Sequence, residues 1–285
     1  MVTPRSWVLA AARAVAGLLP DRLKAAIYRL PVVSGLVRWL LTRAAPGEPV
    51  VVEVAGGLAR GLRLRLDLKT EKYFWLGTHE MPVQRALARE VQPGWTVYDI
   101  GAHVGFFTLA LARQVGAGGR VLAFEPLPAN LSVLRENLAM NPAVSANVQV
   151  IEAAVARESG RASLFAEVST TMARLTAPPA GHTGTYEVAT LALDDLVFAR
   201  GAPPPRLVKM DIEGAEGLAL AGARRLLGEA APLLLIEVHG EEAARTVWEE
   251  LRQAGYRVLT LERDREFLAP GEFAKAHILA VPRRA

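Results

Sequence analysis

Short apolar runs alternate with stretches of helical spacing from residue 93 onward. The apolar runs cover 96–100, 120–125, 148–153, 207–212 and 233–238. Apolar residues recur at helical spacing over 104–115, 128–140, 215–227 and 241–253. This alternation predicts parallel βαβ units, and therefore an α/β fold with a doubly wound, mostly parallel, Rossmann-like sheet. Two more apolar runs, 256–261 and 277–281, follow each other without a helical crossover, so we expect one antiparallel strand near the sheet edge.

The first 92 residues follow a different pattern. Residues 1–45 interleave apolar and arginine positions as short amphipathic helices do. Their apolar stretch 7–19 contains Arg13 and is well short of the ~20 residues that span a membrane, so we expect neither a span nor a signal peptide. The segment is expected to pack on the body of the protein or to rest on an anionic membrane surface. Residues 46–92 are predicted to form a β-hairpin cap, turning around Gly56 and Gly57, followed by a lid or linker.

Composition and charge narrow the classes of protein that remain. Hydrophobic residues make up 51% of the 285, enough for a sizeable core. The absence of cysteine excludes disulfides, thiolate metal sites and a cysteine nucleophile. A net charge of +4 without any block of like charges does not indicate a nucleic-acid partner. We expect a cytoplasmic protein, peripheral to the membrane if residues 1–45 contact it, and these patterns leave its oligomeric state open.

The stretch YDIGAHVGFFTLALA, residues 98–112, passes from a strand through a glycine turn into a helix. In a doubly wound sheet the ligand lies at the carboxyl ends of the strands, and the first such turn lets it approach the backbone. We expect Gly101 and Gly105 to permit that approach. Asp99 would place a carboxylate beside the ligand, which suits an ammonium group better than a phosphate. The stretch also has one glycine fewer than the GxGxxG pattern of dinucleotide binding.

A second acid strengthens this interpretation. Glu125 closes the next predicted strand, in RVLAFEP, 24 residues beyond Gly101. In nucleoside-binding α/β folds an acid at about this offset accepts hydrogen bonds from ribose hydroxyls. The two sites together predict a nucleoside that carries positive charge, and S-adenosyl-L-methionine fits this description.

Several motifs in one order give the chain a family resemblance. They are EKYFWLGTHE (71–80), VYDIGAHVGFFTLALA, VLAFEPLPANLSVLRENL, LDDL (193–196), LVKMDIEGAE (207–216) and LLLIEVHG (233–240). With these motifs the sequence resembles the FkbM-type S-adenosyl-L-methionine-dependent methyltransferases over roughly residues 71–240. The resemblance implies a class I methyltransferase core over 93–285. It also implies O-methylation of a small-molecule hydroxyl, or of one on a sugar, a glycan or a lipid-linked glycan.

The motifs and the resemblance together give a set of candidate cofactor-binding residues. They are Glu80, Asp99, Gly101, His103, Gly105, Phe106, Glu125, Pro126 and Asp211. The acceptor pocket is expected to use the polar, irregular stretch 157–190 and the N-terminal cap, neither of which contains a readable motif.

Ionisable residues near the ends of the next two strands are the candidates for catalysis. They are Lys209, Asp211, Glu213, Glu237 and His239. Glu237 and His239 are two residues apart along an extended run, so both side chains should face the same way. His239 has an ordinary pKa near ~6.5 and would serve as general base, oriented by Glu213 or Glu237. Glu216, in the first turn of a predicted helix, is read as favourable to the helix dipole.

Three alternatives stay open. Asp211, Glu213, Glu237 and His239 could instead hold Mg²⁺ or Mn²⁺, which would lower the pKa of the acceptor hydroxyl. A nicotinamide-dependent oxidoreductase would share the core and the ribose-binding acid. A non-catalytic membrane-surface module with a vestigial nucleoside pocket would use the basic N-terminal segment.

Overall fold

The structure is a computed structural model that describes residues 42–43, 45, 47–166, 173–174 and 184–283. The helices expected over residues 1–45 lie almost entirely outside this part of the chain. Within the described residues, no helix is both long and apolar enough to cross a membrane.

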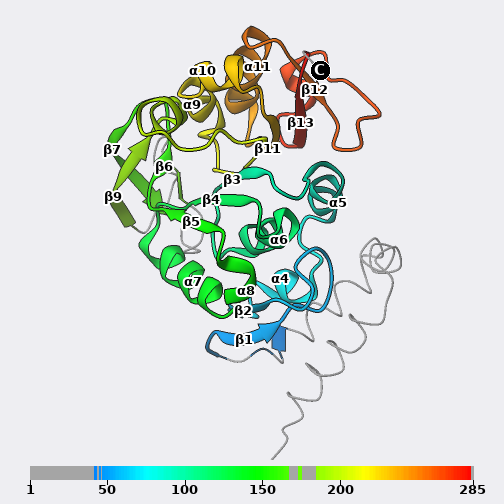
Figure 1. The fold of residues 1–285 in the computed structure, drawn as a ribbon, viewed down its shortest axis with the longest axis vertical. Coiled ribbons are helices and arrows are strands. Elements are labelled where there is room, and N and C mark those ends of the chain that lie inside the picture. Colours follow the sequence, from blue (N-terminus) through cyan, green and yellow to red (C-terminus); the bar gives the residue numbers. More distant parts are fainter. Residues whose placement is uncertain (1–41, 44, 46, 167–172, 175–183, 284–285) are drawn as a thin grey trace, which may run out of the picture.

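A seven-stranded sheet forms the centre of the protein, with strand order β12-β13-β11-β10-β3-β4-β5 (Figure 1). The strands are β3 (Thr96–Ile100), β4 (Arg120–Phe124), β5 (Val148–Ile151), β10 (Leu207–Met210), β11 (Leu233–Glu237), β12 (Tyr256–Leu259) and β13 (His277–Pro282). Neighbouring strands are parallel except at β13, which is antiparallel to both β11 and β12. The predicted doubly wound sheet is confirmed, and its antiparallel strand is second from the edge.

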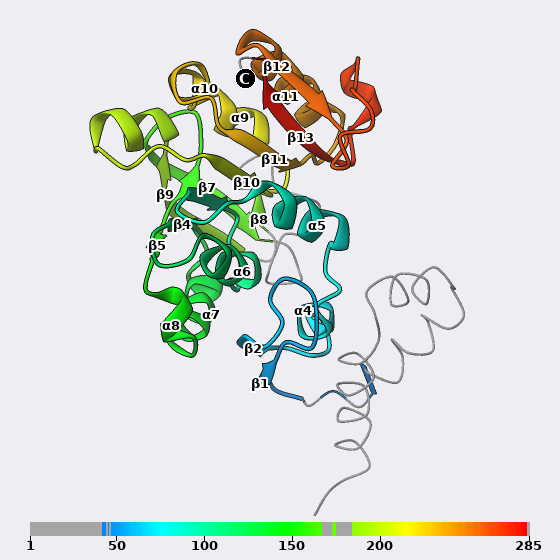
Figure 2. The same ribbon diagram turned by 45° about the vertical axis from the view of Figure 1, so that its right-hand side comes forward.

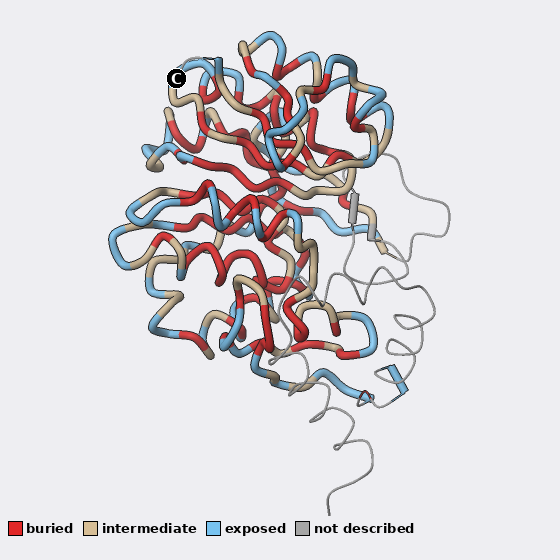
Figure 3. Tube along the Cα trace, turned by 90° about the vertical axis from the view of Figure 1, so that its right-hand side faces the viewer, coloured by how far each residue is buried: buried red, intermediate tan, exposed pale blue. Residues whose placement is uncertain are grey.

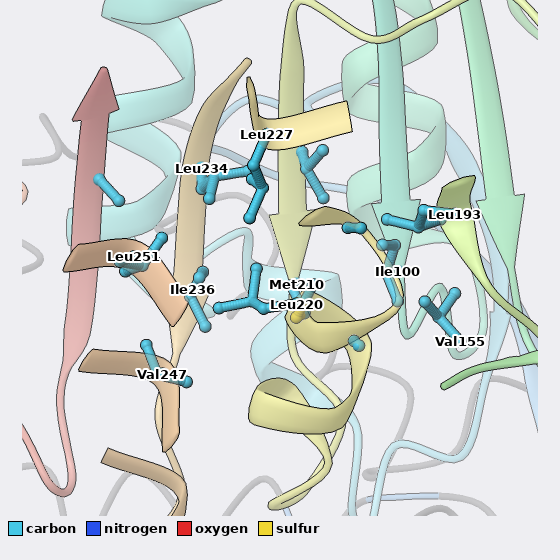
Figure 4. Packing of buried hydrophobic residues seen from close by; sticks show 14 of the residues in the cluster. Ile100, Val155, Leu193, Met210, Leu220, Leu227, Leu234, Ile236, Val247 and Leu251 are labelled. Carbon is cyan, nitrogen blue, oxygen red and sulfur yellow. The ribbon is translucent and has the colours of Figure 1, made fainter. Parts of the chain in front are cut away.

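Helices cover both faces of this sheet because successive strand residues point to opposite sides. On one face, Val97, Val121 and Leu207 pack in a cluster with α5 (Met81–Glu90) and α6 (Phe106–Val115). On the other, Ile100 and Met210 join α9 (Glu216–Ala221), α10 (Arg224–Glu229) and α11 (Glu241–Gln253), as Figure 4 shows. The buried segments in Figure 3 concentrate in these central strands and on the inner sides of the helices. The helix expected over 215–227 is thus two short helices.

The 12-residue helix α7 (Pro128–Ala139) and the short helix α8 (Pro142–Ser145) follow β4. Leu131 and Leu134 of α7 pack on Ala102 and Ala123, next to the glycine turn. The chain also contains a π-helix (Asp195–Ala199) and a 3₁₀ helix (Pro270–Glu272).

The stretch 157–190 was expected to be irregular, and over its described residues, 157–166, 173–174 and 184–190, that expectation was wrong. Its described residues form most of a second sheet of four strands in the order β6-β9-β7-β8. These are β6 (Ala154–Val155), β7 (Gly160–Ala166), β8 (Ala173–Arg174) and β9 (Gly184–Leu191). The first half of β9 is mostly exposed, so its residues are polar and give no strand-like apolar pattern. Leu164 and Val188 of this sheet pack against Leu127, just after β4.

The segment before the core contains the predicted hairpin. Strands β1 (Val50–Glu53) and β2 (Arg63–Leu66) pair antiparallel, and α4 (Lys72–Leu76) leads from them to α5 (Figure 2). Leu64 and Leu66 belong to the same apolar cluster as Val97 and Val121 of the main sheet. The division of the chain at residues 45 and 92 stays a prediction.

Candidate active site

A cavity of about 420 Å³ opens at the carboxyl ends of the central strands. It lies where the chain order reverses between β3 and β10, the position at which open α/β sheets bind ligands. Gly101, Glu125, Asp211 and Glu237, from or just beyond four neighbouring strands, line its floor. Aromatic residues complete the lining from α4 and α6, namely Tyr73, Phe74, Phe106 and Phe107.

The backbone conformation and the packing of the turn require glycine at positions 101 and 105. Gly101 has φ +82°, and a Cβ there would lie 1.9 Å from the carbonyl oxygen of Asp211. Gly105 has φ +91°, and its Cβ would lie 2.6 Å from Leu134 Cδ1. Gly101 lines the cavity, whereas Gly105 lies outside its lining. Strand packing and left-handed backbone therefore already demand both glycines, and the expectation that they also make room for a ligand stays a prediction.

Asp99 also lies outside the lining of the cavity, and its side chain is completely buried. Thr108 donates a 2.6 Å hydrogen bond to its Oδ2, and the Lys209 ammonium lies 3.7 Å from its Oδ1. Lys209 does line the cavity and lies 3.7 Å from Asp211 Oδ2. Burial opposes the charge on Lys209, but the surrounding carboxylates outweigh it and raise its pKa. The sequence suggested that Asp99 contacts an ammonium group of the ligand. In the structure the Asp99 carboxylate is buried and already paired with Lys209, so it does not face the ligand site.

Hydrogen bonds hold the Glu125 carboxylate in place beyond the end of β4, on the opposite side of β3 from Lys209. Its Oε2 accepts a hydrogen bond from His103 N, and its Oε1 accepts bonds from Leu127 N and Asn130 Nδ2, at 2.9 to 3.2 Å. Each carboxylate oxygen has two lone pairs, so acceptor capacity is left for a ligand. Pro126 follows in the lining, and the apolar wall beside it includes Phe124, Leu127, Ala153 and Leu164.

His103 lies in the glycine turn with φ +52°, and its Nε2 is a buried atom without a hydrogen-bond partner. Burial lowers the pKa of His103 to about 4, so the ring is neutral at pH 7. It lines the cavity near Phe74, whose ring centroid is 5.9 Å from its own. An unpaired polar atom in the wall of a cavity is a ready partner for a bound ligand.

His239 follows β11 and is the centre of the acidic end of the cavity. Its Nδ1 lies 2.9 Å from Glu216 Oε1, within a hydrogen bond. Its Nε2 lies 3.7 to 3.8 Å from carboxylate oxygens of Asp211, Glu213 and Glu237. Burial favours the neutral ring, but the bond to Glu216 and the charges of Glu216, Glu213 and Asp211 outweigh it and raise the pKa of His239 to about 9.

Glu216 is the residue whose role the sequence did not reveal. It is 0% exposed, and its Oε1 also accepts a 2.9 Å bond from Gly214 N. Glu216, and not Glu213 or Glu237, makes the hydrogen bond that orients His239. The signal available in the sequence was an acid at the buried side of a first helical turn, but helix-dipole compensation explained it equally well.

Glu80 and two further histidines extend the acidic end. Glu80 is the N-cap of α5, with φ +42°, and its Oε1 lies 2.9 Å from His79 Nε2. His277 Nε2 lies 3.4 Å from Glu80 Oε2 and 3.2 Å from Glu237 Oε2. Burial disfavours its charge, but these two carboxylates raise the pKa of His277 to about 9. Sequence reasoning missed His277 because β13 is antiparallel, which brings its first residue to the edge where the other strands end.

Within the part of the chain that the structure describes, two groups of side chains have the spacing of a cation site. Ligand atoms lie within 4.8 Å of one another for Asp211, Glu237 and His239, and likewise for Glu80, Glu237 and His277. Glu213 belongs to neither group. Each imidazole already has carboxylate oxygens near Nε2, so a proton on the ring accounts for both arrangements.

The fold and the cavity define a nucleoside-binding α/β enzyme with its ligand site at the switch point of the sheet. The Methyltransferase FkbM domain matches residues 99–258, more than half of the chain, and the protein belongs to this family. It is an S-adenosyl-L-methionine-dependent methyltransferase.

Two curated relatives are methyltransferases. The hexuronic acid methyltransferase AglP of Haloferax volcanii is 26% identical over 242 residues, covering 83% of this chain and 95% of that protein. The 31-O-demethyl-FK506 methyltransferase FkbM of Streptomyces tacrolimicus is 29% identical over 184 residues, covering 54% and 69%. A solved structure of methyltransferase FkbM from Methylobacillus flagellatus is 18% identical with a TM-score of 0.44, and the match covers 90% of this chain and 60% of that one.

Proposed function

We propose that the protein methylates a hydroxyl oxygen of its acceptor and that His239 accepts the hydroxyl proton. The observation that carries this proposal is the pairing of His239 Nδ1 with the buried Glu216, which leaves Nε2 facing the cavity. When bound, S-adenosyl-L-methionine supplies the methyl group: the acceptor oxygen forms a bond to its carbon while the carbon–sulfur bond breaks and sulfur keeps the electron pair. The acceptor proton goes to Nε2 of His239, so atoms and charge balance.

The residues present fit this cofactor. Glu125 would bind the ribose hydroxyls, and the apolar wall that includes Phe124 and Leu164 would contact the adenine. His103 offers its unpaired Nε2 at the glycine turn. We further propose that Lys209 and Asp211 hold the amino-acid end, with Asp99 acting through Lys209.

The raised pKa of His239 changes how the base works. A ring whose pKa is about 9 is mostly protonated at neutral pH, whereas the sequence-based expectation assumed an ordinary value. Only the neutral ring accepts a proton, so we expect kcat/KM for S-adenosyl-L-methionine, which follows the groups of the free enzyme, to rise with pH toward about 9.

The names of the relatives support the class of acceptor. AglP is named as a hexuronic acid methyltransferase, and FkbM as a 31-O-demethyl-FK506 methyltransferase. We propose a hydroxyl on a sugar or another small molecule, free or linked to a glycan or lipid. A divalent cation held by Asp211, Glu237 and His239 is the second candidate mechanism, favoured by the spacing of their ligand atoms.

The test uses S-adenosyl-L-methionine with a labelled methyl group and two probe acceptors, methyl glucuronoside and 31-O-demethyl-FK506. We expect transfer to at least one of them, and we expect His239→Ala to reduce kcat by ~10² or more with little change in the affinity for S-adenosyl-L-homocysteine. Lys275→Gln, which replaces an exposed lysine just before β13, is the matched control. Activity that a chelator removes and Mn²⁺ restores would favour the cation, and full turnover in His239→Ala would exclude the base.

A further inference from the structure

Asn137 of α7 joins two parts of the protein that lie far apart in the sequence. Its Oδ1 accepts a 2.6 Å hydrogen bond from Arg65 N in β2, and its Nδ2 donates a 2.8 Å bond to Val104 O in the glycine turn, residues 101–105. Figure 1 shows β2 beside the end of α7. The asparagine is 0% exposed, so water does not compete for these bonds. One amide group thus connects the cap hairpin to the glycine turn.

An amide side chain suits both of these neighbours at once. The N–H of Arg65 can only donate and the C=O of Val104 can only accept, so the amide oxygen must face β2 and the amide nitrogen must face the turn. An ionised aspartate at position 137 would have no donor for Val104, and an apolar side chain would leave both backbone groups without this partner. Because unpaired buried backbone groups are costly, the two contacts hold the amide in one orientation.

The glycine turn that Asn137 holds is itself bonded to the Glu125 carboxylate. His103 N, next to Val104, donates a 2.9 Å hydrogen bond to Glu125 Oε2. Asn130 donates a 3.2 Å bond to Glu125 Oε1 and lies seven residues before Asn137, on the same face of α7. The helix therefore contacts Glu125 at one place and the turn at another, about two helical turns apart. This arrangement fixes the turn and the carboxylate relative to each other.

We propose that Asn137 is a positioning residue of the cofactor site, which holds the glycine turn where the turn and Glu125 together bind S-adenosyl-L-methionine. This inference rests on the cofactor placement given under the proposed function. Asn137 lies outside the lining of the cavity, so it acts through Val104 and the backbone of the turn. The cap hairpin contributes by fixing the orientation of the amide through Arg65 N.

Such a coupling works in both directions. If the position that Asn137 gives the turn favours cofactor binding, bound cofactor must strengthen the hold of Asn137 on Arg65 N by the same factor. The coupling passes through single hydrogen bonds between neutral groups, so we expect each effect to be about threefold to tenfold. An asparagine that only satisfies buried backbone groups would show neither effect.

Asn141 offers a matched control on the same hairpin. Its Oδ1 accepts a 3.0 Å hydrogen bond from Arg63 N, and its Nδ2 donates to Arg63 O and to Asn137 O, both at 2.7 Å. It is buried as well, with 8% exposed. Both asparagines therefore bind the backbone of β2, but of the two only Asn137 is also bonded to the glycine turn.

Calorimetry with S-adenosyl-L-homocysteine on the full chain separates affinity from folding. Asn137→Ala and Asn141→Ala are each measured at a temperature at which circular dichroism shows the variant to be folded. Both should lower the melting temperature, because both remove partners of buried backbone groups. We expect Asn137→Ala to weaken binding by about threefold to tenfold and Asn141→Ala to leave the affinity within about twofold of the wild type. Affinity within that limit in Asn137→Ala, or an equal loss in both variants, would overturn the proposal.

Hydrogen exchange in the wild-type chain keeps the test decisive if Asn137→Ala does not fold. The amide of Arg65 is bonded to Asn137, and the amide of Arg63 is bonded to Asn141. Saturation with S-adenosyl-L-homocysteine should slow exchange of the Arg65 amide by about threefold or more relative to that of Arg63. The same change at both amides, or none at either, would contradict a coupling through Asn137.

The outcome is separate from that of the proposed function. Both measurements need neither an acceptor nor His239, so failure to methylate either probe acceptor would count against the proposed hydroxyl chemistry and leave the affinities as measured. Conversely, methyl transfer that depends on His239, together with native affinity in Asn137→Ala, would refute the positioning role alone.

Discussion

Replacing Glu216 by Gln should move the titration of His239 toward ordinary values. Glu216 is 0% exposed, and its Oε1 lies 2.9 Å from both His239 Nδ1 and Gly214 N. Gln keeps the shape and an acceptor oxygen for both donors but removes the negative charge. The variant therefore isolates the electrostatic part of the contact.

The size of the shift follows from the strength of a charge-assisted hydrogen bond. Such a bond contributes ~1.5 to 3 kcal/mol, and ~1.4 kcal/mol corresponds to one pKa unit. The pKa of His239, about 9 in the native protein, should therefore fall by roughly one to two units in the variant. Glu213 and Asp211 remain near Nε2, so a complete return to the ordinary value is not expected.

The same shift predicts how stability depends on pH. The folded pKa of His239 lies above its value of ~6.5 in the unfolded chain, so protonation favours the folded state. This contribution is fully present below pH ~6.5 and is lost as pH rises through about 9. Because the side chain is partly exposed, solvent screening limits the contribution to about 1–2 kcal/mol. In Glu216→Gln most of it should be lost.

An NMR titration of the His239 ring gives the pKa, and urea unfolding at pH 6 and 9.5 gives the free energy of unfolding. Glu242→Gln, which replaces an exposed carboxylate in the first turn of α11, is the control and should leave unchanged the pKa of His239 and the difference between the two free energies of unfolding. A midpoint of His239 in Glu216→Gln within about 0.3 unit of the wild-type value would refute the assignment of Glu216 as its charged partner.

Three further predictions address the cofactor, the glycine turn and the N-terminal segment. Glu125→Gln should weaken S-adenosyl-L-homocysteine binding about tenfold or more in calorimetry, since a charge-assisted bond to ribose is lost; unchanged affinity would remove Glu125 from the cofactor site. Gly101→Ala should lower the melting temperature far more than Gly94→Ala, because both glycines have positive φ but only Gly101 would place a Cβ against Asp211; equal losses would contradict the packing argument. A chain that begins at Pro46 should fold and bind S-adenosyl-L-homocysteine but no longer associate with anionic vesicles, and loss of cofactor affinity would make residues 1–45 structural.

Most of the main sheet could be predicted because its strands are buried on both faces. Runs such as LVKM and LLLIE are apolar apart from one charged residue each near the carboxyl end, as expected for strands covered by helices on two sides. The second sheet gave no such signal, since β9 exposes much of its length and β7 mixes small and polar residues. A strand with one exposed half contains the same small and polar residues that loops contain, so its sequence does not distinguish it from a loop.

The candidate site was predictable at the ends of parallel strands and unpredictable elsewhere. Parallel strands end at one edge, so Glu125, Asp211 and Glu237 could be placed together from order alone. Whether an acid there faces the ligand or a buried lysine depends on side-chain packing, and Asp99 was misplaced for that reason. His277 needed the register of an antiparallel neighbour, which no local pattern encodes.

The carboxylates at the acidic end of the cavity account for the raised pKa values of His239 and His277. Carboxylates collected at the edge of one sheet repel each other, and such repulsion would destabilise the fold if nothing opposed it. His239 and His277 lie among them with pKa values raised to about 9, so at neutral pH each carries a proton that offsets part of the negative charge. A cationic cofactor placed at this end would supply positive charge of its own and lessen the need for those protons. Cofactor binding should therefore be accompanied by proton release, which calorimetry detects as a binding enthalpy that changes with the ionisation enthalpy of the buffer. An enthalpy for S-adenosyl-L-methionine independent of the buffer at pH 8 would show that the histidines keep their protons and that the positive charge of the cofactor is met elsewhere.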